Sequence, residues 1–219
     1  MSNAGRTRVV ILISGSGTNL QAIIDAQTNG ELDIDIVGVI SDRPDAFGLE
    51  RAANAGIHTE TVDYKNCASR TAFDAELANV LAALKPDLIV LAGYMRILAD
   101  STVNTYQGRM LNVHPSLLPA YPGLNTYARA LAAGEKWHGT TVHFVIPELD
   151  AGPPILQYRV SIKTDETEAE LRERVQQGEY IIYPQAIGWF AANRIGFQDG
   201  QAVVDGEILT AAIIVDEAL

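Results

Sequence analysis

Through the first half of the chain, short apolar runs alternate with longer stretches in which apolar residues recur every three or four positions. The short runs are rich in Val, Ile and Leu and predict buried strands, whereas the longer stretches predict amphipathic helices. The expected strands are 8–13, 35–40, 58–62 and 88–92, and the expected helices are 19–29, 45–54 and the segment that follows Ser69 and ends before Pro86. Strands that alternate with helices of this length indicate right-handed crossovers and a mostly parallel sheet with helices on both faces.

The pattern changes in the second half of the chain. The expected elements there are strands at 111–114, 140–145 and 155–160, a helix near 125–133 and a long helix that a capping box of Thr167 and Glu170 opens. Pro184 predicts a kink in that helix. In the tail, Asp199-Gly200 and Asp205-Gly206 are typical of hairpin turns. The predicted fold class is therefore α/β, with a mostly parallel central sheet and an antiparallel C-terminal extension.

Length and composition are those of an ordinary globular protein. The 219 residues are 47% hydrophobic and 20% charged, which excludes a disordered chain and a coiled coil. We expect a single domain over 8–219, with a first half of about 8–100 and a second half of about 101–219. Residues 1–7 are expected to be a disordered segment or, in part, the remnant of a tag.

Hydropathy, cysteine content and net charge indicate where the protein is located and which classes of partner it can bind. No run of eighteen apolar residues occurs and the polar start lacks a signal-peptide core, so we expect neither a membrane span nor export. Cys67 is the only cysteine, which fits a reducing compartment and a cytoplasmic protein. The net charge of −11 repels phosphate backbones and argues against a nucleic-acid partner. An anionic small molecule is still compatible with a few backbone amides gathered in one cleft.

A glycine-containing loop from Ser14 to Asn19 joins the first strand to the first helix. Free amides and the helix dipole at such a junction favour an anion, so a phosphate is expected on Gly17, Thr18 and Asn19. A Gly-x-Gly turn also arises for packing reasons alone. A dinucleotide site would require a third glycine and an acidic residue after the second strand, and Asp42 keeps that alternative open.

Two polar residues, Asn112 and His114, stand two positions apart at the end of an apolar strand, so their side chains face the same way. Strand ends of a parallel sheet open onto the crevice where ligands bind, and an amide and an imidazole there could polarise a carbonyl together. Asp150 follows in a Gly- and Pro-containing loop, and a carboxylate beside an imidazole favours the charged ring. The alternatives are a buried polar pair satisfied by backbone groups and an Asx turn at Asp150. His138 and His143 are interpreted as structural.

Four ordered segments together resemble the phosphoribosylglycinamide formyltransferases, the single-domain enzymes of the third step of purine synthesis. The matching segments are Ile13–Gln21, Ala92–Leu98, Asn112–Pro119 and His138–Gly152. The similarity extends from about Val9 to about Phe190. It implies a Rossmann-like formyltransferase fold with a phosphate-binding first half and a folate-binding, catalytic second half.

By this resemblance, Asn112, His114 and Asp150 correspond to the catalytic asparagine, histidine and aspartate of the family. The glycinamide amine would attack the formyl carbon of 10-formyltetrahydrofolate while Asn112 and protonated His114 stabilise the oxyanion. Asp150 would keep His114 charged and assist proton transfer from the amine, and no metal would be needed.

The resemblance also implies substrate contacts. Glycinamide ribonucleotide would be bound by Gly17, Thr18, Asn19, Gln176 and Glu179. Folate would be bound by Arg70, Met95, Arg96, Ile97, Leu98, Asn112, Ile146 and Asp150. Ala151 departs from the family pattern, where many members have glycine, which affects the expected conformation of the loop and not the catalytic residues. The partners would be small molecules, and a homodimer is compatible with the family.

Other functions share parts of this pattern. The methionyl-tRNA and sugar-nucleotide formyltransferases and the formyltetrahydrofolate hydrolases have the same catalytic core. The tRNA enzymes carry a further C-terminal domain and a basic surface, and the hydrolases carry an N-terminal regulatory domain, whereas this acidic chain is expected to begin its first strand at Arg8. A non-catalytic nucleotide-binding module would use only the glycine loop and would leave Asn112, His114 and Asp150 unexplained.

Overall fold

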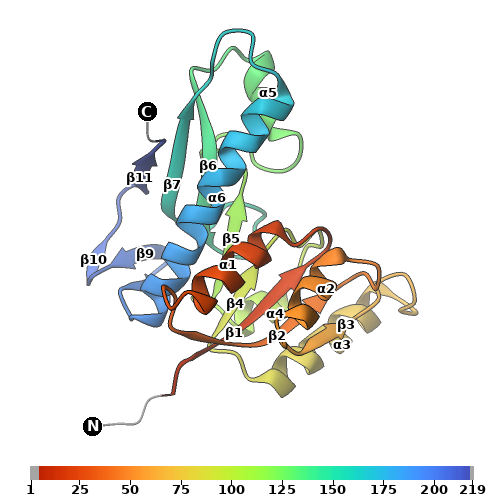
Figure 1. The fold of residues 1–219 in the computed structure, drawn as a ribbon. Coiled ribbons are helices and arrows are strands. Elements are labelled where there is room, and N and C mark those ends of the chain that lie inside the picture. The colour runs from red at the N-terminus through yellow and green to blue at the C-terminus, as the bar shows by residue number, and fades with distance from the viewer. Residues whose placement is uncertain (1–4, 218–219) are drawn as a thin grey trace. The chain divides into compact units, whose positions relative to one another are not determined.

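A computed structural model describes residues 5–217, in two compact units that meet between Leu111 and Asn112. The expected tag remnant at residues 2–4 lies outside the described range. Thr7 already belongs to the first strand, so the predicted disordered segment is wrong at that residue. Whether the two units constitute the single expected domain stays a prediction, and each unit is described by itself (Figure 1).

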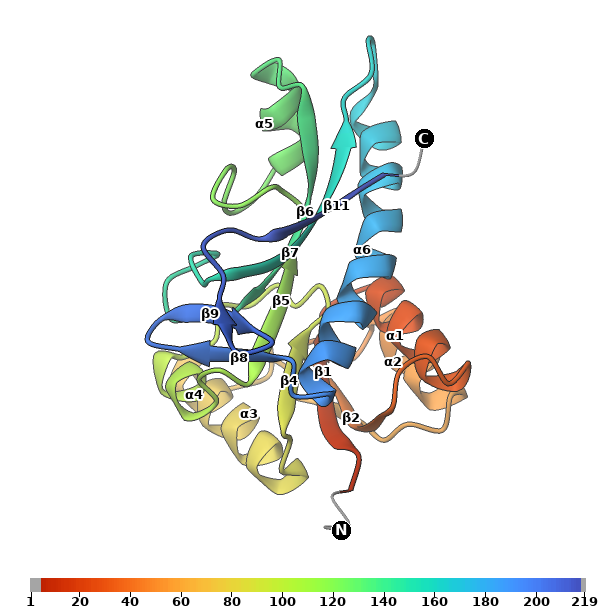
Figure 2. The same ribbon diagram turned by 90° about the vertical axis from the view of Figure 1, so that its left-hand side faces the viewer.

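The first unit has alternating strands and helices, as expected. Its elements are β1 (Thr7–Ile13), α1 (Thr18–Thr28), β2 (Ile34–Ser41), α2 (Phe47–Asn54), β3 (Thr59–Thr61), α3 (Arg70–Leu84), β4 (Leu88–Leu91) and α4 (Asp100–Thr105). The strands lie in the order β4-β1-β2-β3, and every pairing among them is parallel. Figure 2 shows α1 and α2 on one side of these strands and α3 on the other. The prediction of a parallel sheet with helices on both faces is confirmed for this unit.

Local sequence explains why these elements begin and end where they do. The residues of β1 from Val9 to Ile13 are fully buried, as an uninterrupted apolar run in a central parallel strand requires. Ser69 caps α3 by accepting a hydrogen bond from the Ala72 amide at 3.1 Å. Lys85 then turns the chain out of α3 with a left-handed φ of 49°, just before Pro86. Because parallel strands share their direction, the carboxyl ends of all four strands lie at one edge of the sheet.

The second unit has the antiparallel character predicted for the C-terminal half. Its elements are β5 (Met110–His114), which begins in the last residues of the first unit, α5 (Thr126–Ala132), β6 (Trp137–Phe144), β7 (Pro154–Ser161), α6 (Glu168–Ala191), β8 (Ile195–Gln198), β9 (Gln201–Val204), β10 (Glu207–Ile208) and β11 (Ile213–Asp216). β6 and β7 pair antiparallel, and α6 packs on both. The capping box of Thr167 and Glu170 is formed, and Pro184 lies inside α6, where the expected kink stays a prediction.

The tail contains one element that the sequence pattern did not predict. Asp199-Gly200 and Asp205-Gly206 make the expected turns of a three-stranded antiparallel sheet of β8, β9 and β10. The chain then returns as β11, which pairs parallel with β7 at the edge of the other sheet. β11 is four residues long and mostly exposed, so no alternation of buried and exposed residues marks it in the sequence. Its position depends on pairing with a strand more than fifty residues away.

Candidate active site

The glycine-containing loop ends at the first turn of α1. Gly17 occupies the N-cap position with φ 70° and ψ 34°, a left-handed conformation that glycine adopts without steric strain. α1 begins at Thr18, and Asn19 is buried. The three residues predicted to bind phosphate therefore lie together at one helix N-terminus, where the helix dipole favours negative charge.

Two residues of α2 hold this loop in place. The Gly48 amide donates to Gly15 O at 3.0 Å, and Arg51 Nε donates to Ser16 O at 2.8 Å. A Cβ atom added to Gly17 would lie 2.6 Å from the Gly48 Cα, so only glycine permits this close approach. Sequence reasoning missed Arg51, because it stands in an amphipathic helix among other charged residues and belongs to no recognised motif.

The predicted folate-binding segment follows β4 in the first unit. Met95 and Ile97 are 71% and 58% exposed, whereas Leu98 is buried. The Met95 amide donates to Ser14 Oγ at 2.8 Å, which fixes the start of the segment to the end of β1. Two large apolar side chains thus stand in solvent on a backbone that is held in place, as a surface for an aromatic ligand would require.

Arg70, another predicted folate residue, lies beside the same segment. It is the first residue of α3, and its Nε donates to both carboxylate oxygens of Asp74 at 2.9 Å. Its Nη2 donates to Ile97 O. The structure therefore brings together two residues, Arg70 and Ile97, that are both predicted to bind folate.

In the second unit, His114 and Asp150 face each other. His114 is the last residue of β5 and its side chain is 8% exposed, while Asp150 lies in the turn after β6 with its side chain 7% exposed. His114 Nδ1 is 3.4 Å from Asp150 Oδ2, and His114 Nε2 is 3.0 Å from Tyr121 O. Because both ring nitrogens face oxygen acceptors, the arrangement suits a doubly protonated imidazolium. The predicted meeting of these two side chains is found.

The third predicted residue, Asn112, has a partner that the sequence did not indicate. Asn112 Nδ2 is 3.1 Å from His143 Nε2, and His143 Nδ1 is 2.8 Å from Phe144 O. A carbonyl only accepts hydrogen bonds, so Nδ1 carries the proton and Nε2 accepts from the Asn112 amide. Burial lowers the pKa of His143 to about 4, which keeps the ring neutral and preserves this tautomer at neutral pH.

This contact gives His143, interpreted from the sequence as structural, a specific partner. Its ring fixes which atom of the Asn112 amide is the nitrogen, and therefore which way that amide can donate. The only signal in the sequence was the position of His143 on an apolar strand, which does not separate such a role from simple burial. His138 is also buried, and its burial lowers its pKa to about 4.

Residues 146–153 form neither helix nor strand, as expected from the Gly and Pro residues on either side of Asp150. Asp150 has a φ of 53°, and its Oδ2 accepts a hydrogen bond from the Gly123 amide at 2.8 Å. Two residues later, a Cβ on Gly152 would lie 1.7 Å from Phe144 O, so glycine is required for the chain to return along β6. These constraints hold the carboxylate next to the imidazole.

The predicted ribonucleotide residues of the second unit lie on α6. Gln176 and Glu179 are three positions apart and therefore share one face of the helix. Glu179 is buried, and its charge adds to burial in raising the pKa of Tyr127. A buried carboxylate on a helix face is suited to accept hydrogen bonds from hydroxyl groups.

Within residues 5–217, no group of three or more His, Cys, Asp or Glu side chains is arranged to hold a metal ion. Over the same range, no helix is both long enough and apolar enough to cross a membrane.

The fold and these residues together define the class of protein. The first unit has a parallel α/β sheet and a glycine loop at a helix N-terminus, and the second unit brings His114 and Asp150 together. Residues 7–187 match the formyl transferase family, and the chain belongs to that family.

The comparisons with individual proteins are more specific. The chain is 49% identical over 201 residues to phosphoribosylglycinamide formyltransferase of Escherichia coli (strain K12), a match that covers 92% of this chain and 95% of that protein. A solved phosphoribosylglycinamide formyltransferase from Coxiella burnetii superposes with a TM-score of 0.91 at 49% identity, covering 95% of this chain and 99% of the other. A formyltetrahydrofolate deformylase from Burkholderia mallei is more distant, with a TM-score of 0.83, 28% identity and coverage of 92% of this chain and 70% of the other.

Proposed function

We propose that this protein transfers the formyl group of 10-formyltetrahydrofolate to the amine of glycinamide ribonucleotide, a step of purine biosynthesis. The observation that carries the proposal is the His114–Asp150 pair, buried and 3.4 Å apart, in a chain that is 49% identical to an enzyme named for this reaction. A binding module that used only the glycine loop would not need this pair or the oriented Asn112 amide.

In this proposal, the attack of the amine on the formyl carbon places negative charge on the formyl oxygen, and two side chains donate hydrogen bonds to that oxygen. Asn112 uses one N–H to hold His143 and the other to reach the oxygen. His114 exchanges its bond to Tyr121 O for a bond to the same oxygen. Preorganised donors of this kind are among the largest contributions to catalysis, because they need no reorganisation as the charge develops.

Asp150 has two tasks in the proposed reaction. Its carboxylate stabilises the His114 imidazolium, and it accepts a proton from the attacking amine, through water. General acid–base assistance of this kind contributes about 10² to 10⁴ in rate. The new bond between the amine and the formyl carbon replaces the bond from that carbon to the folate nitrogen. The amine loses one proton and the folate nitrogen gains one, so the step balances without an oxidant or a reductant.

The remaining substrate contacts are proposed from the family. Gly17, Thr18 and Asn19 bind the phosphate, and Gln176 and Glu179 bind nearer the ribose. On the folate side, the contacts are Arg70, Met95, Arg96, Ile97, Leu98, Asn112, Ile146 and Asp150, and Arg96 reaches the ligand through its main chain because its side chain is bound to Asp42. We also infer no nucleic-acid partner, supported by the net charge of −11, and a cytoplasmic location, supported by the single cysteine. The family resemblance implies in addition that no metal is needed, and no membrane partner is expected. A homodimer is a further prediction, which gel filtration would test.

The test is a spectrophotometric assay of formyl transfer from 10-formyltetrahydrofolate or its dideaza analogue, with and without glycinamide ribonucleotide. We expect folate product only in the presence of the acceptor. Folate product formed without the acceptor would indicate a deformylase instead. No product in either reaction would favour a binding module. His114→Ala should abolish turnover, whereas His58→Ala, on an exposed histidine of the first unit, serves as the matched control.

A further inference from the structure

Arg96 stands in the predicted folate-binding segment, but its side chain is directed back into the protein. Its Nε donates to Asp42 Oδ2 at 2.8 Å, and the Asp42 side chain is only 1% exposed. The guanidinium carbon lies 3.8 Å from the centre of the Tyr64 ring. Arg96 is therefore clamped between a buried carboxylate and an aromatic face, an arrangement that needs the planar guanidinium and that lysine would not reproduce.

This clamp belongs to a network across the carboxyl ends of the four strands of the first unit. Asp42 follows β2, Tyr64 follows β3, and the Tyr64 amide donates to Asp42 O at 3.2 Å. Met95 follows β4, and its amide donates to Ser14 Oγ, which follows β1, at 2.8 Å. The Asp42–Arg96 bond thus connects the segment after β4 with the ends of β2 and β3.

The same segment is held from its other side by α3. Arg70 donates to Ile97 O while Asp74 holds the Arg70 guanidinium. The backbone from Met95 to Leu98 is therefore fixed on both sides, although its Met95 and Ile97 side chains stand in solvent. A recognition surface of this kind presents backbone groups and apolar side chains to the ligand. The Arg96 guanidinium holds this segment in place and does not form part of the surface.

We propose that Asp42 is a positioning residue for the folate co-substrate, which acts by holding Arg96 and thereby the backbone from Met95 to Leu98. This inference rests on the proposed function, since it assumes that this segment binds folate. Asp42 does not itself touch the ligand. Burial, together with the charge of Asp42, raises the pKa of Tyr94, so the Asp42 charge acts inside the unit and not at the surface.

If Asp42 acted on folate only through its charge, Asp42→Asn would change folate binding in the opposite direction. Folates carry anionic glutamate groups, so replacing a nearby carboxylate by a neutral amide would remove repulsion and tighten binding. The same change would release the Arg96 cation to attract those groups. Positioning predicts weaker binding, because the free segment must then be ordered by the ligand.

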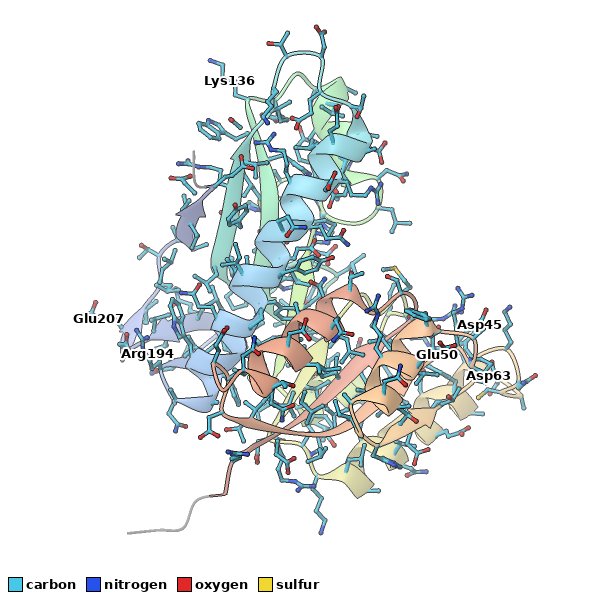
Figure 3. All side chains as sticks on the ribbon, in the orientation of Figure 1. Asp45, Glu50, Asp63, Lys136, Arg194 and Glu207 are labelled. Carbon is cyan, nitrogen blue, oxygen red and sulfur yellow. The ribbon has the colours of Figure 1, made fainter. Side chains whose placement is uncertain are left out.

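The experiment compares Asp42→Asn with Asp45→Asn. Both variants replace an aspartate whose carboxylate bonds an arginine, but Asp45 pairs with Arg43 at the surface, with 68% of its side chain exposed (Figure 3). We expect Asp42→Asn to raise the KM for the folate co-substrate about tenfold, as the loss of a charge-assisted hydrogen bond suggests. The KM for glycinamide ribonucleotide and kcat should stay within about twofold of wild type, as should all constants of Asp45→Asn.

Two further measurements keep the outcomes distinct. In the Asp42→Asn/Arg96→Met double variant, the rise in the folate KM should be no larger than in the single variants, because both substitutions remove the same interaction between Asp42 and Arg96. If Asp42→Asn does not fold, Tyr64→Leu keeps an apolar contact with Phe73 but removes the aromatic face, and should also raise the folate KM.

An unchanged or lower folate KM in a folded Asp42→Asn protein, with active wild type, overturns the positioning role. Equal rises in the KM for both substrates would indicate general destabilisation and would also contradict the positioning role. Urea unfolding of each variant measures this destabilisation directly. Inactive wild type would instead refute the proposed function.

Discussion

Replacing Asp150 by asparagine removes one charge from the site while nearly preserving its shape. In the structure, the same oxygen, Oδ2, accepts from the Gly123 amide at 2.8 Å and faces His114 Nδ1 at 3.4 Å. An asparagine oxygen in this position can still accept from Gly123. The backbone is also tolerated, because asparagine adopts a positive φ such as the 53° of Asp150 more readily than most residues. The variant should therefore fold and still bind both substrates.

The magnitude follows from the distance. Two unit charges 3.4 Å apart, at an effective dielectric constant of about 20, attract each other by about 5 kcal/mol. Each 1.36 kcal/mol lost from the stabilisation of the transition state lowers the rate about tenfold. Losing that attraction can lower the rate by at most roughly 10³- to 10⁴-fold. Losing general acid–base help lowers the rate by about 10²- to 10⁴-fold. We expect kcat of Asp150→Asn to fall about 10³-fold, with both KM values within about threefold.

Single-turnover formyl transfer, followed by the absorbance of the dideazafolate product, measures this loss without interference from product release. Asp199→Asn is the matched control, since Asp199 has a similar φ of 51° and lies in the β8–β9 turn. A kcat within about tenfold of wild type for folded Asp150→Asn would refute the reasoning, because the imidazolium would then not depend on the carboxylate. A rise in KM with unchanged kcat would refute it as well, since it would make Asp150 a binding residue only.

Two further predictions concern the loop and the buried histidines. Gly17→Ala forces a Cβ to within 2.6 Å of the Gly48 Cα at a φ of 70°, so we expect a large rise in the KM for glycinamide ribonucleotide and a loss of about 2 kcal/mol in stability. Gly15→Ala, whose Cβ meets nothing within 4 Å, should behave as wild type in the same assays, and equal effects of the two changes would contradict this explanation. Burial lowers the pKa of both His138 and His143 to about 4, whereas in the unfolded chain each takes up a proton below about pH 6.5. The folded state therefore loses stability as the pH falls from about 6.5 toward about 4, by about 2 kcal/mol per histidine at pH 5. Urea unfolding between about pH 8 and about pH 5 measures this, and a free energy of unfolding that does not decline would contradict the assignment.

Much of the fold could be predicted from local sequence. The apolar run of β1 and the Ser69 cap of α3 depend on residues close together in the chain, and the structure confirms both within one or two positions. The Asp199-Gly200 turn is equally local. β11 could not be predicted, because its exposed residues acquire strand structure only by pairing with β7.

The candidate site divides in the same way. The sequence by itself determined the types and order of the central residues: Asn112 and His114 on one side of a strand, a later aspartate in a loop, and a glycine loop before a helix. Strand periodicity and turn chemistry are encoded within a few residues, so these features can be read without knowledge of distant contacts.

Only the tertiary structure decided which side chains meet. The His143 ring that orients Asn112, the Arg51 side chain that holds the glycine loop, and the Asp42 carboxylate that holds Arg96 each join residues about thirty to fifty positions apart. Hydrogen bonds of this kind require distances near 3 Å and specific angles, which depend on strand pairing and helix packing and not on sequence spacing. For that reason the sequence indicated the candidate site residues, whereas the contacts that hold them emerged only from the folded chain.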